Sequence, residues 1–135
     1  MSKDVIWVVA AAIMGSDDLW LMHRRPYEKA HGGLWEFPGG KVEGIEIPTQ
    51  SLVRELHEEL GINVHERDCE PAGFAQGWDE NREHPIVILL YKVVAWEGEP
   101  NALEGGAVAW CARERIAELQ KPPLDQQLAA QLFPD

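Results

Sequence analysis

The sequence predicts an α/β fold of the α+β kind, in which helices cover a mixed sheet on both faces, as a single domain over residues 1–135. The chain is long enough for one hydrophobic core and too short for two. Several apolar runs have the length of strands, and two other segments have helical periodicity. Strands and helices do not alternate regularly, so a doubly wound parallel sheet is not favoured.

The first part of the chain is expected to form two strands and a loop. Residues 5–14 are rich in Val, Ile and Ala, which favours a strand that ends at a small polar turn. A second strand is predicted at 19–23. Residues 24–33 mix Pro, Gly, Lys and Tyr without periodicity, which predicts a loop, and residues 34–37 then lead into Pro38-Gly39-Gly40.

Residues 48–60 are predicted to form a helix. Pro48 suits a first helical turn, and Gly61 is well placed to end the helix. The apolar residues that recur at helical spacing are Leu52, Val53, Leu56 and Leu60.

The remainder of the chain is expected to alternate strands and short helices. The continuous apolar run 86–91 is typical of a strand that is buried on both faces. The predicted elements are strands at 72–76 and 85–96, a loop at 98–106, a strand at 107–111, a helical turn at 114–119 and a closing helix at 123–133.

The composition excludes several classes of function. The formal net charge of -11 opposes nonspecific binding to polymeric nucleic acid and to anionic membranes. There is no apolar run of the ~20 residues that a membrane helix needs, and no basic leader. Cys69 and Cys111 lack metal-ligand spacing, so we expect reduced thiols in a cytoplasmic protein. An acidic protein can still bind a small phosphorylated ligand through a bridging divalent cation.

The predicted helix carries carboxylates that do not favour its stability. At about 100° per residue, Glu55, Glu58 and Glu59 form one patch beside the apolar stripe. Like charges at this spacing repel, and the helix dipole disfavours anions in the last turn. A solvated acidic face would tolerate a repulsion of about a few tenths of a kcal/mol. A metal site would explain the arrangement, because carboxylates at this spacing converge on a hard cation such as Mg²⁺.

The patch belongs to a longer pattern. Residues 40–62, GKVEGIEIPTQSLVRELHEELGI, resemble at every position the signature of the Nudix hydrolases: G, five residues, E, seven residues, REU, one residue, EE, one residue, GU, where U is aliphatic. The resemblance implies a Nudix-type α/β/α sandwich and metal-dependent hydrolysis at phosphorus, with Mg²⁺ or alternatively Mn²⁺ as cofactor.

The resemblance also implies roles for individual residues. Arg54 would hold a carboxylate in orientation, although a plain surface ion pair is geometrically as available. Glu46 would support the metal shell, and Gly39 would let the backbone come close. The implied metal ligands are Gly40, Glu55, Glu58, Glu59 and Glu104. The implied catalytic residues are the same four glutamates with Arg54, and either Glu55 or Glu104 is the general base.

Outside the signature, the chain resembles the MutT branch of the family. Arg25 matches an arginine near the nucleotide, and Phe37 either lines a base pocket or belongs to the core. Asp125 follows a Pro-Pro pair, where MutT has a base-reading asparagine, and it is equally explained as a first-turn acid of the last helix. The matching runs are Arg24-Arg25, Glu36-Phe37-Pro38-Gly39-Gly40, Gly98-Glu99-Pro100 and Leu103-Glu104-Gly105.

The predicted activity is that of a Mg²⁺-dependent, MutT-like nucleoside triphosphate pyrophosphohydrolase. Water would attack phosphorus and release a nucleoside monophosphate and pyrophosphate. We expect an oxidised or modified triphosphate such as 8-oxo-dGTP as substrate, with CTP or dCTP as the alternative. The alternative of another class is a non-catalytic nucleotide sensor, although such modules usually lose carboxylates that this chain keeps. We expect a monomer or homodimer that binds neither polymeric nucleic acid nor membrane.

Overall fold

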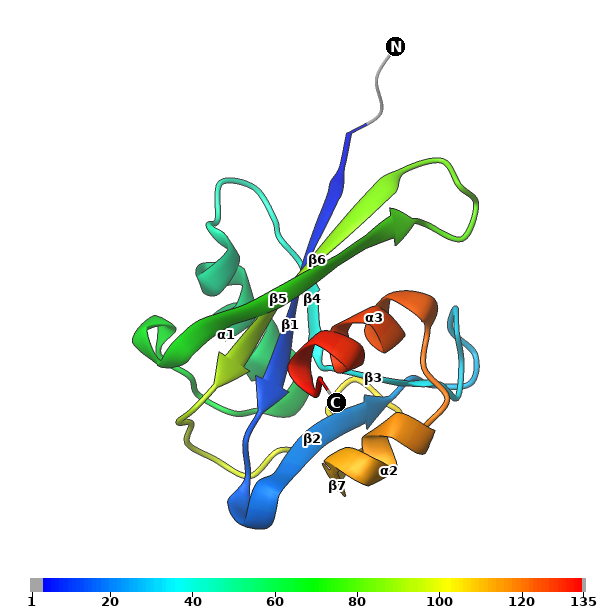
Figure 1. Ribbon diagram of the computed structural model, residues 1–135. Coiled ribbons are helices and arrows are strands. Elements are labelled where there is room, and N and C mark those ends of the chain that lie inside the picture. Colours follow the sequence, from blue (N-terminus) through cyan, green and yellow to red (C-terminus); the bar gives the residue numbers. More distant parts are fainter. Residues whose placement is uncertain (1–3, 135) are drawn as a thin grey trace.

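The computed structural model describes residues 4–134, and its largest layer is a four-stranded sheet (Figure 1). The strand order is β4-β1-β6-β5, with β1 parallel to β6 and the other pairs antiparallel. The sheet is therefore mixed, as predicted. The four strands are β4 (Gly39–Lys41), β1 (Ile6–Ile13), β6 (Pro85–Val93) and β5 (Cys69–Trp78).

A second, smaller sheet is antiparallel throughout and has the order β3-β2-β7. The strands are therefore divided between two sheets, which the prediction of a mixed sheet did not specify. The chain reverses at Ser16–Asp18, where Asp17 and Asp18 have positive φ, and β2 then pairs with β7 instead of joining β1. The three strands are β3 (Trp35–Glu36), β2 (Leu19–Arg24) and β7 (Ala107–Ala112).

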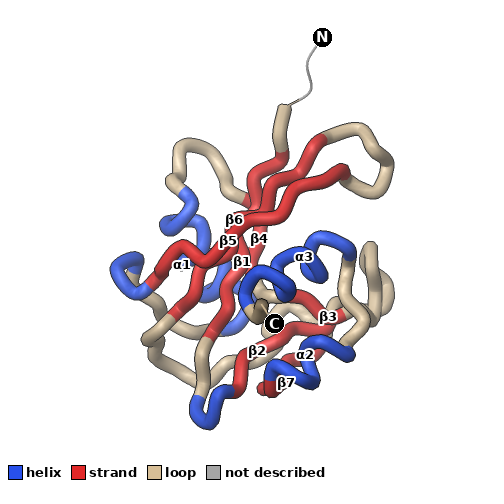
Figure 2. Tube along the Cα trace, in the orientation of Figure 1, coloured by secondary structure: helices blue, strands red, loops and turns tan. Residues whose placement is uncertain are grey.

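Helices cover the large sheet on both faces, which gives the predicted α/β/α layering (Figure 2). The helix α1 (Pro48–Leu60) packs on the face that carries Val9 and Ile13 of β1. The helix α3 (Pro123–Leu132) packs with the alternate β1 residues on the opposite face. The short helix α2 (Arg113–Glu118) follows β7 directly.

The ends of α1 agree with the sequence prediction. Pro48 is the first helical residue, and Gly61 ends the helix in the left-handed conformation with φ of 75°. Leu52, Leu56 and Leu60 are fully buried, as expected for the apolar stripe.

Several other predicted boundaries and one burial prediction were wrong. The strand predicted at 72–76 extends over Cys69–Trp78, and the strand predicted at 85–96 ends at Val93. Two short strands, Trp35–Glu36 and Gly39–Lys41, lie where no element was predicted. The central strand β6 is mostly half-buried, and only Leu90 and Val93 of it are buried. The reason is that the outer part of the β5–β6 hairpin extends beyond the helices (Figure 1).

The outer strand β5 has a side-chain contact along its free edge. The backbone N–H of Phe74 donates to Oε1 of Gln131 at 3.0 Å, and Nε2 of Gln131 donates to the Phe74 carbonyl at 2.6 Å. Gln131 lies on α3, so this pair of hydrogen bonds joins the helix to the edge strand.

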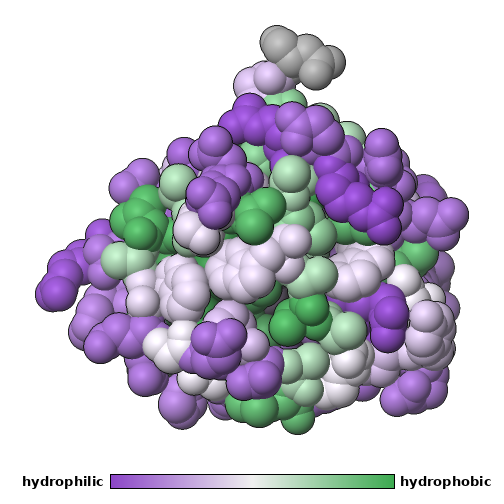
Figure 3. Space-filling model, turned by 90° about the horizontal axis from the view of Figure 1, so that it is seen from below, coloured by the Kyte–Doolittle hydropathy of each residue, from purple (hydrophilic) through white to green (hydrophobic). Residues whose placement is uncertain are grey.

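The surface seen from below carries hydrophobic side chains in small groups that polar side chains separate (Figure 3). Scattered exposed apolar residues of this kind are normal for a protein surface. Among the described residues there is no helix that is both long and apolar enough to cross a membrane.

Candidate active site

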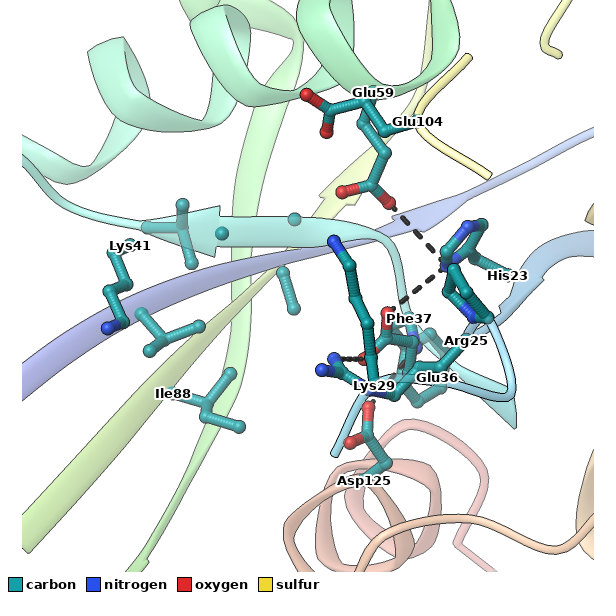
Figure 4. A pocket seen from close by; sticks show the side chains of 16 residues that line it. His23, Arg25, Lys29, Glu36, Phe37, Lys41, Glu59, Ile88, Glu104 and Asp125 are labelled. Atoms are coloured by element: carbon teal, nitrogen blue, oxygen red, sulfur yellow. Dashed lines mark hydrogen bonds and ion pairs between the residues drawn. The ribbon is translucent and has the colours of Figure 1, made fainter. Parts of the chain in front are cut away.

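A cavity of about 300 Å³ lies between the large sheet, the C-terminal end of α1 and the first turn of α3 (Figure 4). This volume is at the lower end of the range for small-molecule sites. Of the residues predicted for the site, the cavity brings together Arg25, Phe37, Gly39, Gly40, Glu59, Glu104 and Asp125. The other predicted residues lie beside it, around Arg54.

Arg54 makes contacts well beyond a surface ion pair. Its Nε and Nη2 atoms donate to the two oxygens of Glu46 at 2.9 and 3.0 Å. Nη1 donates to Glu55 at 2.7 Å and to Glu58 at 3.3 Å. Nη2 also donates to the carbonyl of Lys41 at 3.1 Å, so the guanidinium joins β4 and the following loop to α1. This geometry suits a residue that orients carboxylates.

Glu46 is occupied by protein donors and is therefore suited to a supporting role. In addition to both bonds from Arg54, its Oε1 accepts from the hydroxyl of Ser51 at 2.8 Å. The hydrogen bonds from Arg54, followed by that from Ser51, lower the pKa of Glu46 to about 2. The carboxylate is thus ionised and held in place at neutral pH.

Gly39 and Gly40 stand where no side chain fits. A Cβ atom on Gly39 would overlap the carbonyl of Val9 in β1, and a Cβ atom on Gly40 would overlap the carboxylate of Glu55. Gly39 therefore allows β4 to lie close to β1, and Gly40 allows the Glu55 carboxylate to lie directly against the backbone of β4.

The three helix carboxylates differ in exposure. The side chain of Glu58 is 49% exposed, that of Glu55 15% and that of Glu59 10%. Burial raises the pKa of Glu55 and that of Glu59, and repulsion from Glu104 adds to both shifts. Figure 4 shows Glu59 and Glu104 on the same side of the cavity.

This donor set fits a divalent cation. Oε1 of Glu59 is buried and has no hydrogen-bond partner among the residues that the structure describes. A cation here would satisfy that oxygen and offset the burial and the repulsion that raise the pKa values of Glu55 and Glu59. Glutamate oxygens are also the ligand type that hard cations prefer.

His23 is a site residue that the sequence analysis did not predict. Its side chain is buried, with Nδ1 at 3.1 Å from Oε2 of Glu36 and at 3.8 Å from Oε1 of Glu59. Nε2 lies 3.0 Å from the carbonyl of Gly105. Burial alone would lower the pKa of His23, but the hydrogen bond to Glu36 and the contact with Gly105 raise it above its ordinary value.

The cavity lining contains basic side chains as well as carboxylates. Nη1 of Arg25 donates to Glu36 at 2.9 Å, and its Nε donates to the carbonyl of Ala30 at 2.6 Å. Lys29 and Lys41, which the sequence analysis did not predict, also line the cavity (Figure 4). These cations are placed to attract phosphates.

Asp125 lies on the α3 side of the cavity. It is 6% exposed, and its Oδ1 accepts a hydrogen bond from the backbone N–H of Phe37 at 3.1 Å. Burial, followed by repulsion from Glu36, raises the pKa of Asp125 to about 7. Asp125 also lies in the first turn of α3, where the helix dipole favours an acid. The side chain of Phe37 is buried in the core with Met22 and Leu90, which favours the core alternative for this residue.

Comparison with known proteins agrees with this geometry. The family model described as the NUDIX domain matches residues 5–134. The chain belongs to the Nudix family. It is therefore a hydrolase of phosphorus-containing acid anhydrides.

Individual Nudix proteins resemble this Nudix hydrolase over most of its length. CTP pyrophosphohydrolase of Escherichia coli is 37% identical over 117 residues, which cover 87% of this chain and 84% of that protein. The 8-oxo-dGTP diphosphatase of E. coli is 32% identical over 128 residues, with 92% and 94% coverage. The solution structure of the E. coli ORF135 protein matches with a TM-score of 0.82 and 36% identity, over 95% of this chain and 88% of that one.

The residues that sequence reasoning missed had weak local signals. His23 is a single histidine at the end of an apolar strand, which most often means an ordinary core residue. Lys29 lies in an irregular loop. Glu36 belongs to the MutT-like run that ends at Gly40, and that run was the available signal for it.

Proposed function

We propose that this Nudix hydrolase is a Mg²⁺-dependent nucleoside triphosphate pyrophosphohydrolase that removes oxidised or modified nucleotides from the cytoplasmic pool. The observation that carries the proposal is the cavity itself, which is lined both by buried carboxylates and by the cations Arg25, Lys29 and Lys41. The carboxylates suit a divalent ion, and the cations suit the phosphates of a nucleotide. The names of two similar proteins, a diphosphatase and a pyrophosphohydrolase, support the same class of reaction.

In the proposed reaction, the metal ion and the protein side chains would have separate roles. Bound Mg²⁺ would neutralise phosphate charge and make the attacking water more acidic. The ion would be held by Gly40, Glu55, Glu58, Glu59 and Glu104. Arg54 would keep Glu55 and Glu58 in place, and Glu55 or Glu104 would accept the proton of the water as it attacks phosphorus. The anhydride bond between the α- and β-phosphates then breaks, giving a nucleoside monophosphate and pyrophosphate.

Base recognition is assigned to Asp125. A carboxyl group with a pKa of about 7 is partly neutral at physiological pH, and the neutral form offers a donor beside an acceptor. This pair matches the O6 acceptor and N7–H donor of 8-oxoguanine. Unmodified guanine presents acceptors at both O6 and N7, so it matches less well.

The second candidate substrate is CTP or dCTP. Neutral Asp125 also matches the N3 acceptor and N4 donor of cytosine. The 37% identity to a CTP pyrophosphohydrolase favours this candidate.

The test is pyrophosphate release with Mg²⁺ and a panel of 8-oxo-dGTP, dGTP, CTP, dCTP, 5-methyl-dCTP and nucleotide sugars. We expect kcat/KM for 8-oxo-dGTP to exceed that for dGTP by at least about tenfold, the worth of one good hydrogen-bond pair. A preference for CTP would select the second candidate. Nucleotide binding without turnover of any compound would indicate the sensor instead.

A further inference from the structure

The geometry points to His23 as a positioning residue that fixes Glu104 against the carboxylates of α1. The inference rests on the proposed function, because it assigns a partner to one of the proposed catalytic glutamates. It concerns a residue that lies outside the Nudix signature, on β2 of the smaller sheet.

Glu104 depends on its backbone for its position. Its residue is exposed, and its side chain makes no hydrogen bond or ion pair with any residue in the described range 4–134. The loop around it contains Gly105 and Gly106 with φ of 99° and 81°, a conformation that glycine adopts freely. Such a segment needs tethers if Glu104 is to be placed accurately.

Among the contacts that hold this loop, two lie directly beside Glu104, one on each side. The N–H of Leu103 donates to the main-chain carbonyl of Glu59 at 3.0 Å, which holds the loop to the end of α1. The carbonyl of Gly105 lies 3.0 Å from Nε2 of His23. A carbonyl only accepts hydrogen bonds, so Nε2 must carry the proton that it donates. The His23 tether joins β2 to the carbonyl of the residue that follows Glu104.

The imidazole is itself held firmly, which makes it an effective anchor. The residue is 6% exposed, and its other nitrogen lies 3.1 Å from Oε2 of Glu36. The second oxygen of Glu36 accepts from Arg25 at 2.9 Å. The ring is therefore fixed at both nitrogens, and the chain of contacts runs from Arg25 through Glu36 and His23 to the residue after Glu104.

Two conservative substitutions separate the two contacts of the ring. The amide nitrogen of Gln can occupy the place of Nε2, so His23→Gln keeps a donor for Gly105. The amide nitrogen of Asn corresponds to Nδ1, so His23→Asn keeps a donor for Glu36 and loses the hydrogen bond to the carbonyl of Gly105. We expect kcat of His23→Asn to fall about 10–100-fold, as displaced catalytic groups do, with KM changed less than about threefold. His23→Gln should keep more of the wild-type kcat than His23→Asn, because it keeps the donor for Gly105.

A double-mutant cycle tests whether the effect passes through Glu104. In a Glu104→Gln background, His23→Asn should reduce kcat little further, because the group that it displaces is already changed. Full additivity of the two effects would overturn the inference. Equal losses in His23→Asn and His23→Gln would also overturn it, because the hydrogen bond to Gly105 would then not be the cause.

Hydrogen exchange gives a readout that does not need activity. The amides of residues 103–106 should exchange faster in His23→Asn than in wild type or His23→Gln, and unchanged exchange would refute the tether. If His23→Asn does not fold, His23→Met, which fills similar space without a donor, takes its place. Absence of turnover in the wild-type protein would instead reject the proposed function, and the exchange experiment would still decide the role of His23.

Discussion

At the scale of the residue, the carboxyl groups of this protein fall under two opposite influences. Arg54 and Ser51 surround Glu46 with donors, and its pKa falls to about 2. Asp125 and Glu59 are buried with fewer donors, and their pKa values rise. Donors stabilise the ionised form, whereas burial destabilises it. Neutral and ionised carboxyls therefore coexist around one cavity at neutral pH.

Asp125 should make stability depend on pH. Its folded pKa is raised to about 7, so its contribution is fully present below the unfolded pKa of about 3.9 and is lost as pH rises through 7. Asp125→Asn is uncharged and keeps the acceptor for Phe37. As pH rises from 6 to 8, the unfolding free energy of the variant should increase by roughly 1 kcal/mol relative to that of wild type. Urea denaturation without metal at several pH values measures this difference, with Glu118→Gln, an exposed substitution, as control. If the unfolding free energies of wild type and Asp125→Asn changed in parallel with pH, the prediction would be contradicted.

Glu58 offers the cleanest separation of activity from stability. It is the most exposed of the three helix carboxylates and lies in the last turns of α1. Glu58→Gln should reduce turnover by about 100-fold or more, as expected when a stabilising group at the reacting phosphate is lost. The unfolding free energy should stay within about 0.5 kcal/mol of wild type or increase slightly, because a repelling charge is removed. Pyrophosphate release and metal-free thermal denaturation test both parts, and wild-type turnover would refute the metal-ligand role.

At the scale of the element, α1 and β4 act as one unit. Arg54 joins them through Glu46 and the carbonyl of Lys41, and Gly40 lets Glu55 lie against the strand. The sequence predicted the ends of α1 because its signals, Pro48 and Gly61, are local. It did not predict which helix glutamate is buried, because that depends on His23 and the smaller sheet, which are distant in sequence.

Arg54→Lys should show what the planar guanidinium contributes. A lysine ammonium cannot contact both oxygens of Glu46 and also reach Glu55, so the helix carboxylates would lose their fixed orientation. We expect kcat to fall about 10–100-fold, as for other partners that orient metal ligands. Arg115→Lys, in an exposed pair with Glu118 on α2, is the matched control. A similar small effect of both substitutions on kcat would contradict this role.

At the scale of the whole molecule, the formal net charge of -11 is combined with a cavity whose lining includes the cations Arg25, Lys29 and Lys41. The layers, the strand segments and the signature carboxylates followed from the sequence. The division into two sheets did not, because it depends on β2 pairing with β7, about ninety residues further along the chain. His23, on β2, contacts Gly105 next to β7 because of that long-range pairing.

Metal binding should be linked to both stability and pH. A cation that binds only the folded protein stabilises it, and binding requires Glu55 and Glu59, whose pKa values are raised, to lose their protons. We therefore expect Mg²⁺ or Mn²⁺ to raise Tm, and to raise it more at pH 8 than at pH 6. Thermal denaturation with and without metal at both pH values checks this. An equal rise at both pH values would show that these protons are not released, and Glu58→Gln should reduce the rise.

The contact between Gln131 and Phe74 has a consequence for the behaviour of the protein in concentrated solution. An outer strand with free N–H and C=O groups is a template for edge-to-edge aggregation, and here a side-chain amide occupies both groups of one residue as a neighbouring strand would. Gln131→Ala should therefore aggregate faster than wild type in light-scattering measurements, whereas Gln127→Ala, on the same helix, should not. Equal aggregation of the two variants would contradict this protection. If only Gln131→Ala aggregates faster, this one glutamine keeps the acidic enzyme monodisperse without taking part in catalysis.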